Sequence, residues 1–273
     1  MDDPEFTVLR LRFSFILKTL LHRVQPSSPQ TIPRRIWQTM KTSCLPPFMK
    51  RVAKSWTTLN PEYEYGLFDD DAVAEFVRSE FPDFLPGWQK LKHGAAKADL
   101  WRYLVMFRYG GVYADLDCFC RAPLREWINP EAAYVTQLGI NKDLCQWLLI
   151  SVPENPIFLR AAERALDNIL CDRCSAEYDG FQLVAGELTL RQGHPHINIL
   201  DPVRALTGPP VLQEAAEECF KNSSCPAIFQ HTQVVCISEN TSCNMAGNVK
   251  HDHGNQDYLE ELRQLRAPHY PQS

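Results

Sequence analysis

Two aspartates one residue apart, Asp115 and Asp117, offer the clearest chemistry in this sequence of 273 residues. They end the stretch Gly110–Asp117 (GGVYADLD), in which an apolar run follows a glycine pair. Side chains alternate between the two faces of an extended strand, so Tyr113 should share a face with both aspartates. Carboxylate oxygens at a strand end suit a divalent cation that carries a phosphate. The segment therefore predicts a cation and phosphate site.

A second acidic and basic pair precedes this stretch. Residues 95–109 are expected to form a helix that ends at the glycine pair, and Asp99 and Arg102 are neighbours on one face of it. If that face is exposed, the pair contributes little to stability. If the helix packs back on the strand, Arg102 could bind phosphate with its planar donor fork, and Asp99 could accept hydrogen bonds from sugar hydroxyls. Ligands of open α/β sheets bind beyond the carboxyl ends of strands, where Asp115 and Asp117 lie.

Strands and helices are expected to alternate along the chain. The expected strands are residues 32–38, 63–68, 112–117, 134–138, 147–151 and 233–237. The expected helices are residues 46–59, 69–77, 95–109, 157–170, 202–206, 211–220 and 258–266. This order predicts an α/β fold with a mostly parallel sheet.

The stretches Ala95–Tyr103 and Tyr109–Asp117 resemble the signature of DXD-containing glycosyltransferases. The most similar family is that of the yeast initiating α-1,6-mannosyltransferase, with α-1,4-galactosyltransferase and inositol-phosphoceramide mannosyltransferases. The large clostridial glucosylating toxins share the motif more distantly. The resemblance also covers Ile32–Thr39 and Thr207–Pro209, and runs from about Ile32 to His253. It implies a GT-A fold with a single Rossmann-like mixed sheet flanked by helices.

The same resemblance implies a domain organisation and an activity. Residues 31–257 would be the GT-A domain, residues 1–30 a leader, linker or truncated anchor, and residues 258–273 a terminal helix and tail. The enzyme would move a hexose from a nucleotide-sugar, GDP-mannose or a UDP-hexose, to a glycan or glycolipid hydroxyl, with retention and with Mn²⁺ or Mg²⁺. The implied roles are Asp117 on the metal, Asp115 on the metal shell, ribose or sugar, Asp99 and Arg102 on the donor sugar, Tyr113 near the nucleotide and Trp37 near the base.

Near the carboxyl end the sequence departs from the family pattern. Family members often carry His followed by Gly-Ser-Trp, whereas this chain has His251 and then Gly254-Asn255-Gln256. This change puts the usual closing contact on the diphosphate in doubt. His251, Asp252 or His253 could complete the metal shell, because imidazole and carboxylate side chains both ligate such ions. Solvated loop residues are the equally favoured alternative.

Composition limits the compartment and the partners. The chain has 28 Lys and Arg against 33 Asp and Glu, for a formal net charge of −5, and it has no basic run with interleaved aromatics that would indicate a nucleic-acid partner.

The ten cysteines favour disulfides over a structural zinc site or free thiols, and they indicate a Golgi or other secretory-pathway lumen. The close pairs are Cys171 with Cys174, Cys219 with Cys225, and Cys236 with Cys243. Sequons at Asn222 and Asn240 agree with that compartment.

The amino-terminal stretch Phe6–Leu21 carries Arg10, Arg12 and Lys18, so no uninterrupted apolar run reaches the length of a transmembrane helix. The alternatives for this stretch are a truncated membrane anchor, an amphipathic helix and a wrongly predicted start of the sequence.

Two other functions fit an Asp-x-Asp strand end. One is a phosphatase or phosphotransferase of the haloacid-dehalogenase type, although Phe119 stands where that motif wants Thr or Val, and Asp99 and Arg102 would have no role. The other is a non-catalytic relative that binds a nucleotide-sugar or glycan, or that scaffolds a partner.

Overall fold

The computed structural model describes residues 31–138, 144–170, 181–184, 187–190, 202–221, 232–236 and 249–251. The amino-terminal stretch, both sequons, His253 and the expected helix 258–266 lie outside the described residues. Each close cysteine pair also has at least one member outside them, so the disulfides stay a prediction. Within the described ranges, no helix is long and apolar enough to cross a bilayer.

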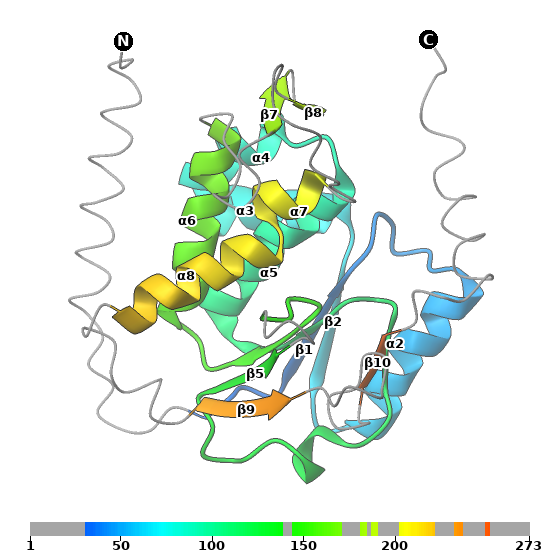
Figure 1. Ribbon diagram of the computed structural model, residues 1–273. Helices are drawn as coiled ribbons and strands as arrows, with labels where there is room; N and C mark the ends of the chain where they lie inside the picture. Colours follow the sequence, from blue (N-terminus) through cyan, green and yellow to red (C-terminus); the bar gives the residue numbers. More distant parts are fainter. Residues whose placement is uncertain are drawn as a thin grey trace. The chain divides into compact units, whose positions relative to one another are not determined.

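The core of the fold is a six-stranded mixed sheet in the order β2-β1-β3-β6-β5-β9 (Figure 1). Its strands are β1 (Arg35–Thr39), β2 (Glu64–Phe68), β3 (Gly111–Ala114), β5 (Tyr134–Leu138), β6 (Leu148–Ser151) and β9 (Thr232–Cys236). β1 pairs in parallel with β2 and β3, whereas β6 runs antiparallel to both β3 and β5. The α/β class is therefore confirmed. The sheet is mixed, as the family resemblance implies, and not mostly parallel, as the order of the elements predicts.

Two small sheets and the helices complete the described structure. The small sheets pair β4 (Cys118–Cys120) with β10 (Val249–His251), and β7 (Phe181–Val184) with β8 (Glu187–Leu190). The helices are α2 (Pro47–Leu59), α3 (Asp70–Glu80), α4 (Leu85–Lys90), α5 (Gly94–Tyr109), α6 (Pro156–Leu170), α7 (Pro202–Thr207) and α8 (Pro209–Lys221), with short 3₁₀ turns at Pro82–Phe84 and Leu124–Glu126.

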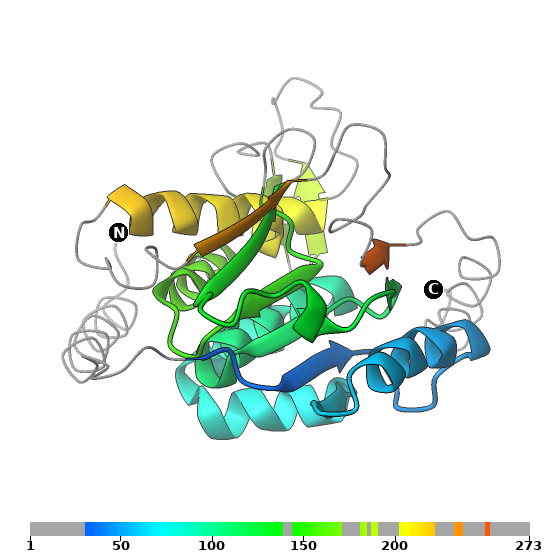
Figure 2. The same ribbon diagram turned by 90° about the horizontal axis from the view of Figure 1, so that it is seen from below.

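Helices α5, α6, α7 and α8 pack on one another and form one layer (Figure 1). α2 stands apart from that layer and packs on β4, next to β10. In Figure 2, α8 (yellow) and α2 (blue) lie far from each other, with strands between them. β4 is therefore supported by α2, which is not part of that helix layer.

The helix α5 occupies the centre of the fold. Leu100, Trp101, Tyr103 and Leu104 are fully buried, so the helix is covered nearly all round rather than along a single stripe. Because this part of α5 is enclosed, Asp99 and Arg102 cannot turn to solvent and need partners inside the protein.

The glycine pair after α5 is required by the backbone. Gly110 and Gly111 have φ of 58° and 96°, a region that other residues rarely adopt. A Cβ at Gly110 would lie 2.5 Å from the Pro153 nitrogen, and one at Gly111 would lie 2.6 Å from the Arg35 carbonyl. The pair therefore lets the chain leave α5 and enter β3 directly, as the sequence indicates.

Candidate active site

The Asp-x-Asp segment forms a turn, which corrects the extended strand expected over residues 112–117. β3 ends at Ala114, and the Cys118 amide donates to the Asp115 carbonyl at 3.0 Å. Leu116, at the centre of the turn, buries its side chain in the core that also holds Cys118. The turn reverses the chain into β4, so the alternation of a strand does not place Asp115 and Asp117 on one face. Their position beyond the carboxyl end of β3 is nevertheless as predicted.

Three neighbouring elements hold the backbone of this turn. The buried Gln38 amide on β1 donates to the Asp115 carbonyl at 3.2 Å, and the Asp115 amide donates to the Trp147 carbonyl at 2.9 Å. The Trp56 indole on α2 donates to the Cys118 carbonyl at 2.6 Å. The turn is thus fixed on both sides by groups that are distant in sequence.

The Asp115 side chain accepts from two donors at one oxygen. The Tyr113 hydroxyl donates to Asp115 Oδ1 at 2.5 Å, and Arg102 Nη2 lies 3.1 Å from the same atom. Burial is the main cause that raises the pKa of Tyr113 well above its ordinary value, so the phenol stays protonated and able to donate. About a quarter of the Asp115 side chain (26%) remains exposed, so the carboxylate can still face a ligand.

Arg102 joins the helix to the turn. Its guanidinium lies over the Tyr113 ring at 4.7 Å and pairs at 3.1 Å with Asp99 Oδ1 as well as with Asp115. Burial alone lowers the pKa of Arg102, but the attraction of Asp115, and also that of Asp99, outweighs it and raises the pKa, so the group stays charged. The pair Asp99–Arg102 is therefore a buried ion pair, with 8% and 7% of the side chains exposed, and not a surface one.

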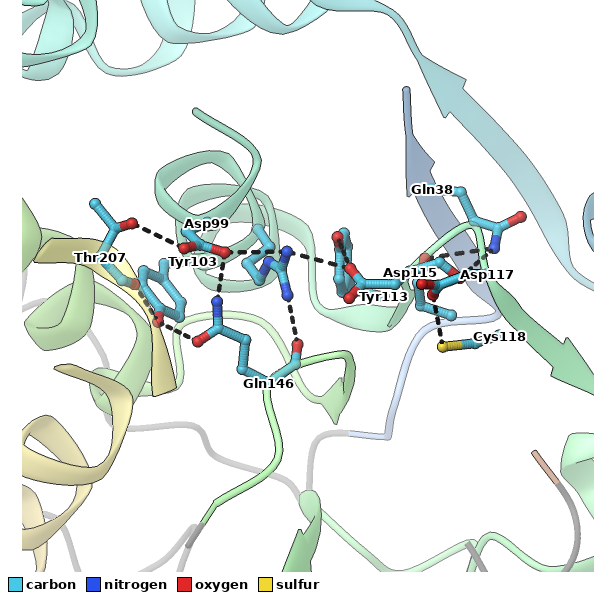
Figure 3. Close-up of polar contacts among 11 residues, drawn as sticks. Gln38, Asp99, Tyr103, Tyr113, Asp115, Asp117, Cys118, Gln146 and Thr207 are labelled. Atoms are coloured by element: carbon cyan, nitrogen blue, oxygen red, sulfur yellow. Dashed lines mark hydrogen bonds and ion pairs between the residues drawn. The ribbon is translucent and has the colours of Figure 1, made fainter. Parts of the chain in front are cut away.

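Asp99 is held by residues from two further positions in the chain. The Gln146 amide donates to Asp99 Oδ1 at 2.5 Å, and the Thr207 hydroxyl donates to Asp99 Oδ2 at 2.8 Å (Figure 3). Gln146 also accepts from the Tyr103 hydroxyl at 3.2 Å, and its carbonyl accepts from Arg102 Nη1 at 3.0 Å. The dashed contacts in Figure 3 run from Thr207 through Asp99 to Asp115 without a break.

Asp117 lies in the same turn and is 6% exposed. The Cys118 thiol donates to Asp117 Oδ1 at 3.4 Å, a weak bond to sulfur. Burial first, and then the charge of Asp117, raises the pKa of Cys118, so the sulfur is a protonated donor.

The other predicted metal ligands are placed only in part. His251 ends β10, where its register partner is Cys118, the residue next to Asp117. His253 lies outside the described residues. Across the part of the chain that the structure describes, no group of three or more His, Cys, Asp or Glu side chains could hold a metal by itself. Two carboxylates suit Mg²⁺ or Mn²⁺, which commonly take one or two carboxylates and complete their shell with phosphate and water.

Trp37 and Tyr113 make contacts within the protein. The Trp37 indole donates to the Gly110 carbonyl at 2.8 Å and its ring lies 5.9 Å from those of Phe68 and Tyr109. Gly110 precedes β3, whereas Asp115 follows it, so the indole hydrogen bond of Trp37 lies at the far end of that strand. They favour a packing role, and contact of Trp37 with a base stays a prediction. Tyr113 is 1% exposed and acts through Asp115, and its approach to a nucleotide also stays a prediction.

Sequence reasoning missed Gln38 and Gln146 as parts of this site. Gln38 was assigned to a strand and Gln146 to the segment before one, and neither stands in a motif that indicates chemistry. Both are buried polar side chains, and such groups need partners. Burial is a tertiary property, so no signal in the sequence alone could have found them.

The fold is shared with solved domains of known enzymes. Solved glycosyltransferase domains have the same fold: PaToxG glycosyltransferase, with a TM-score of 0.50 at 13% identity over 81% of each chain, and the UDP-bound domain of the YGT toxin, with 0.50 at 10% identity over 75% of this chain and 80% of that one. The fold is thus that of GT-A glycosyltransferases, as predicted.

Comparisons of sequence then indicate which glycosyltransferases this chain resembles. Residues 46–134 match the family model described as "Glycosyltransferase sugar-binding region containing DXD motif", which confirms the family resemblance over that region. Mannosyl phosphorylinositol ceramide synthase SUR1 of Saccharomyces cerevisiae is 36% identical over 152 residues, 54% of this chain and 38% of the relative. The initiation-specific alpha-1,6-mannosyltransferase of the same yeast is 28% identical over 126 residues, 43% of this chain and 26% of the relative.

A third relative, inositol phosphoceramide mannosyltransferase 3 of Schizosaccharomyces pombe, is 35% identical over 103 residues, 38% of this chain and 29% of the relative. The chain thus spans well under two thirds of the length of these relatives.

Proposed function

We propose that this protein is a metal-dependent, retaining glycosyltransferase that moves a hexose from a nucleotide-sugar to a hydroxyl of a glycan or glycolipid. The observation that carries the proposal is the unbroken set of contacts from Asp99 through Arg102 to the Asp115 turn, beyond the carboxyl end of β3. A matching DXD region and the names of the relatives support it.

The donor proposed is GDP-mannose, because the relatives named above are mannosyltransferases or mannosyl synthases. UDP-hexoses are the alternative, since a solved domain of the same fold binds UDP. The acceptor proposed is a glycan or a glycolipid hydroxyl, and the compartment is a Golgi or other secretory-pathway lumen.

In this proposal, Asp117 is the direct metal ligand and Asp115 completes the shell or contacts the donor. Asp115 Oδ1 accepts from Tyr113 and pairs with Arg102, which suits a role of Asp115 in the metal shell or on the donor. A bound Mn²⁺ or Mg²⁺ would stabilise the negative charge of the diphosphate leaving group.

Arg102 fixes the orientation of Asp115, and it keeps a positive charge beside the turn where the diphosphate would lie. Asp99 anchors Arg102 from the opposite side, and Gln146 and Thr207 in turn hold Asp99. A site in which each charged group is held by others loses little free energy to reorganisation when charge develops on the substrate. We assign no protein nucleophile, since an acceptor hydroxyl can attack on the face that the phosphate leaves, and that phosphate can take its proton.

The decisive experiment measures thermal stabilisation and hydrolysis with a panel of GDP-mannose, UDP-galactose, UDP-glucose and UDP-N-acetylglucosamine, with and without Mn²⁺. We expect one donor to raise the melting temperature in a Mn²⁺-dependent way and to be slowly hydrolysed. Binding without hydrolysis or transfer would favour a non-catalytic relative. Release of phosphate from a phosphomonoester, with no effect of any nucleotide-sugar, would contradict the proposal and favour a phosphatase.

A further inference from the structure

The charges of this chain are unevenly distributed. The whole sequence has a formal net charge of −5, yet residues 31–61 hold six Lys and Arg and no Asp or Glu. α2 carries three of these cations, Lys50, Arg51 and Lys54, and no acidic residue at all. This stretch is therefore strongly cationic within an acidic protein.

The three cations occupy one side of α2. At 100° per residue they span about 100° of the helix surface, and all three side chains are exposed. The buried residues Phe48, Met49, Val52 and Trp56 lie on the opposite side, against the core. We call Lys50, Arg51 and Lys54 the basic face of α2.

Several other surface cations pair with nearby carboxylates. Arg78, Arg108 and Arg125 pair with Glu75, Glu80 and Glu62, and on α6 Arg160 and Arg164 both pair with Glu218 of α8. Among the residues that the structure describes, no ion pair involves the basic face of α2. Three unneutralised charges on one helix produce a positive field that an anionic surface can match.

The basic face lies directly behind the site. Trp56, on the inner side of the same helix, donates to the carbonyl of Cys118, which follows Asp117. A surface that touches the basic face would therefore lie about one helix diameter, roughly 10 Å, from the backbone of the Asp-x-Asp turn.

We propose that the basic face of α2 docks this protein on an anionic lipid surface. Its exposed positions carry cations, Pro47, Thr57 and Thr58, with no large apolar side chain, so the contact is electrostatic and does not insert into the bilayer. Each Lys or Arg near an anionic leaflet strengthens binding about fivefold, so three together strengthen the binding by about two orders of magnitude. This docking goes beyond the proposed function and is tested without it.

The test measures binding of the full chain to sedimented vesicles of phosphatidylcholine alone and of phosphatidylcholine with about 30% phosphatidylserine. The variant Lys50→Gln/Lys54→Gln removes two charges from the basic face. The matched control Lys90→Gln/Lys92→Gln removes two exposed charges at the end of α4, which lies well away from α2 in Figure 1. Unchanged melting temperatures would show that each variant folds.

We expect the wild type to bind only the vesicles with phosphatidylserine, and high salt to weaken that binding. The α2 variant should bind about 25-fold more weakly and the control variant within about twofold of the wild type. Equal losses in both variants, no loss in either, or equal binding to neutral vesicles would overturn the proposal. Loss of binding to a short RNA, with no vesicle binding by the wild type, would assign the face to nucleic acid and overturn it too.

Discussion

The two halves of the candidate site are built in different ways. The helix half, Asp99 and Arg102 on α5, is almost fully buried and is held by side chains. The turn half, Asp115 and Asp117, is held largely through its backbone, and a quarter of the Asp115 side chain is exposed. The difference indicates that the helix half supplies a fixed charged frame, while the turn half leaves the Asp115 carboxylate partly open to a ligand. Changes in the first half should cost stability, and changes in the second should cost chemistry.

The largest effect is expected from Arg102→Ala. Two carboxylates, Asp99 and Asp115, would lose their shared counter-charge, and an uncompensated buried charge typically costs about 3–5 kcal/mol. Urea unfolding measures this loss. Arg108→Ala, on the same helix, is the matched control, because its pair with Glu80 is half exposed and should contribute less than about 1 kcal/mol. Equal losses of unfolding free energy in the two variants would contradict the expected difference between the buried ion pairs of Arg102 and the surface ion pair of Arg108.

Asp117→Asn should act on chemistry instead. We expect transfer to fall about 100-fold or more because a metal ligand loses its charge, while the free energy of unfolding changes little. Steady-state kinetics over a Mn²⁺ titration, together with urea unfolding, checks both parts. The control is Asp83→Asn, a solvent-exposed carboxylate in the 3₁₀ turn after α3, which should keep full turnover. Normal turnover in the Asp117→Asn variant would contradict the assignment of Asp117 as a metal ligand.

A smaller effect is expected from Gln146→Met, which keeps the volume and removes both side-chain hydrogen bonds. A bond to a charged group contributes about 1.5–3 kcal/mol, so donor affinity should fall about tenfold. If Gln146 acts through Asp99, the double variant with Asp99→Asn should bind the donor no more weakly than the worse single variant. Calorimetric titration of donor gives the four affinities, and additive losses would mean that Gln146 acts independently. Gln89→Met, which replaces an exposed glutamine on α4, is the control.

The smallest effect is expected from Tyr65→Phe. The Tyr65 hydroxyl donates to the Gln38 amide oxygen at 2.8 Å, and Gln38 in turn donates to the Asp115 carbonyl. Loss of one such bond should destabilise the protein by about 1 kcal/mol and leave the donor KM within about twofold. Thermal unfolding detects this. Tyr63→Phe, just before the same strand, removes a half-buried hydroxyl at another position and should change stability less. A large rise in KM would show that the turn depends on Gln38 more than its other anchors suggest.

Much of the local structure was predictable. The expected helix over residues 95–109 is α5 (Gly94–Tyr109), and its glycine stop is required by positive φ angles. The strand over residues 112–117 was too long, because an apolar Leu116 between two aspartates fits a strand pattern as well as it fits a turn that buries one side chain. β4 and β10 were missed, because strands of three residues give no periodic signal.

The sequence by itself determined the chemical types and their order: an acidic pair after a glycine stop, a helix with Asp99 and Arg102, and an α/β alternation. These features depend on spacing and on backbone preferences, which act over a few residues. Only the tertiary structure decided that Arg102 is shared between Asp99 and Asp115, and that Gln38, Gln146 and Thr207 hold the frame. Those contacts join residues from 3 to 108 positions apart, and they exist because buried polar groups must find partners in the packed interior.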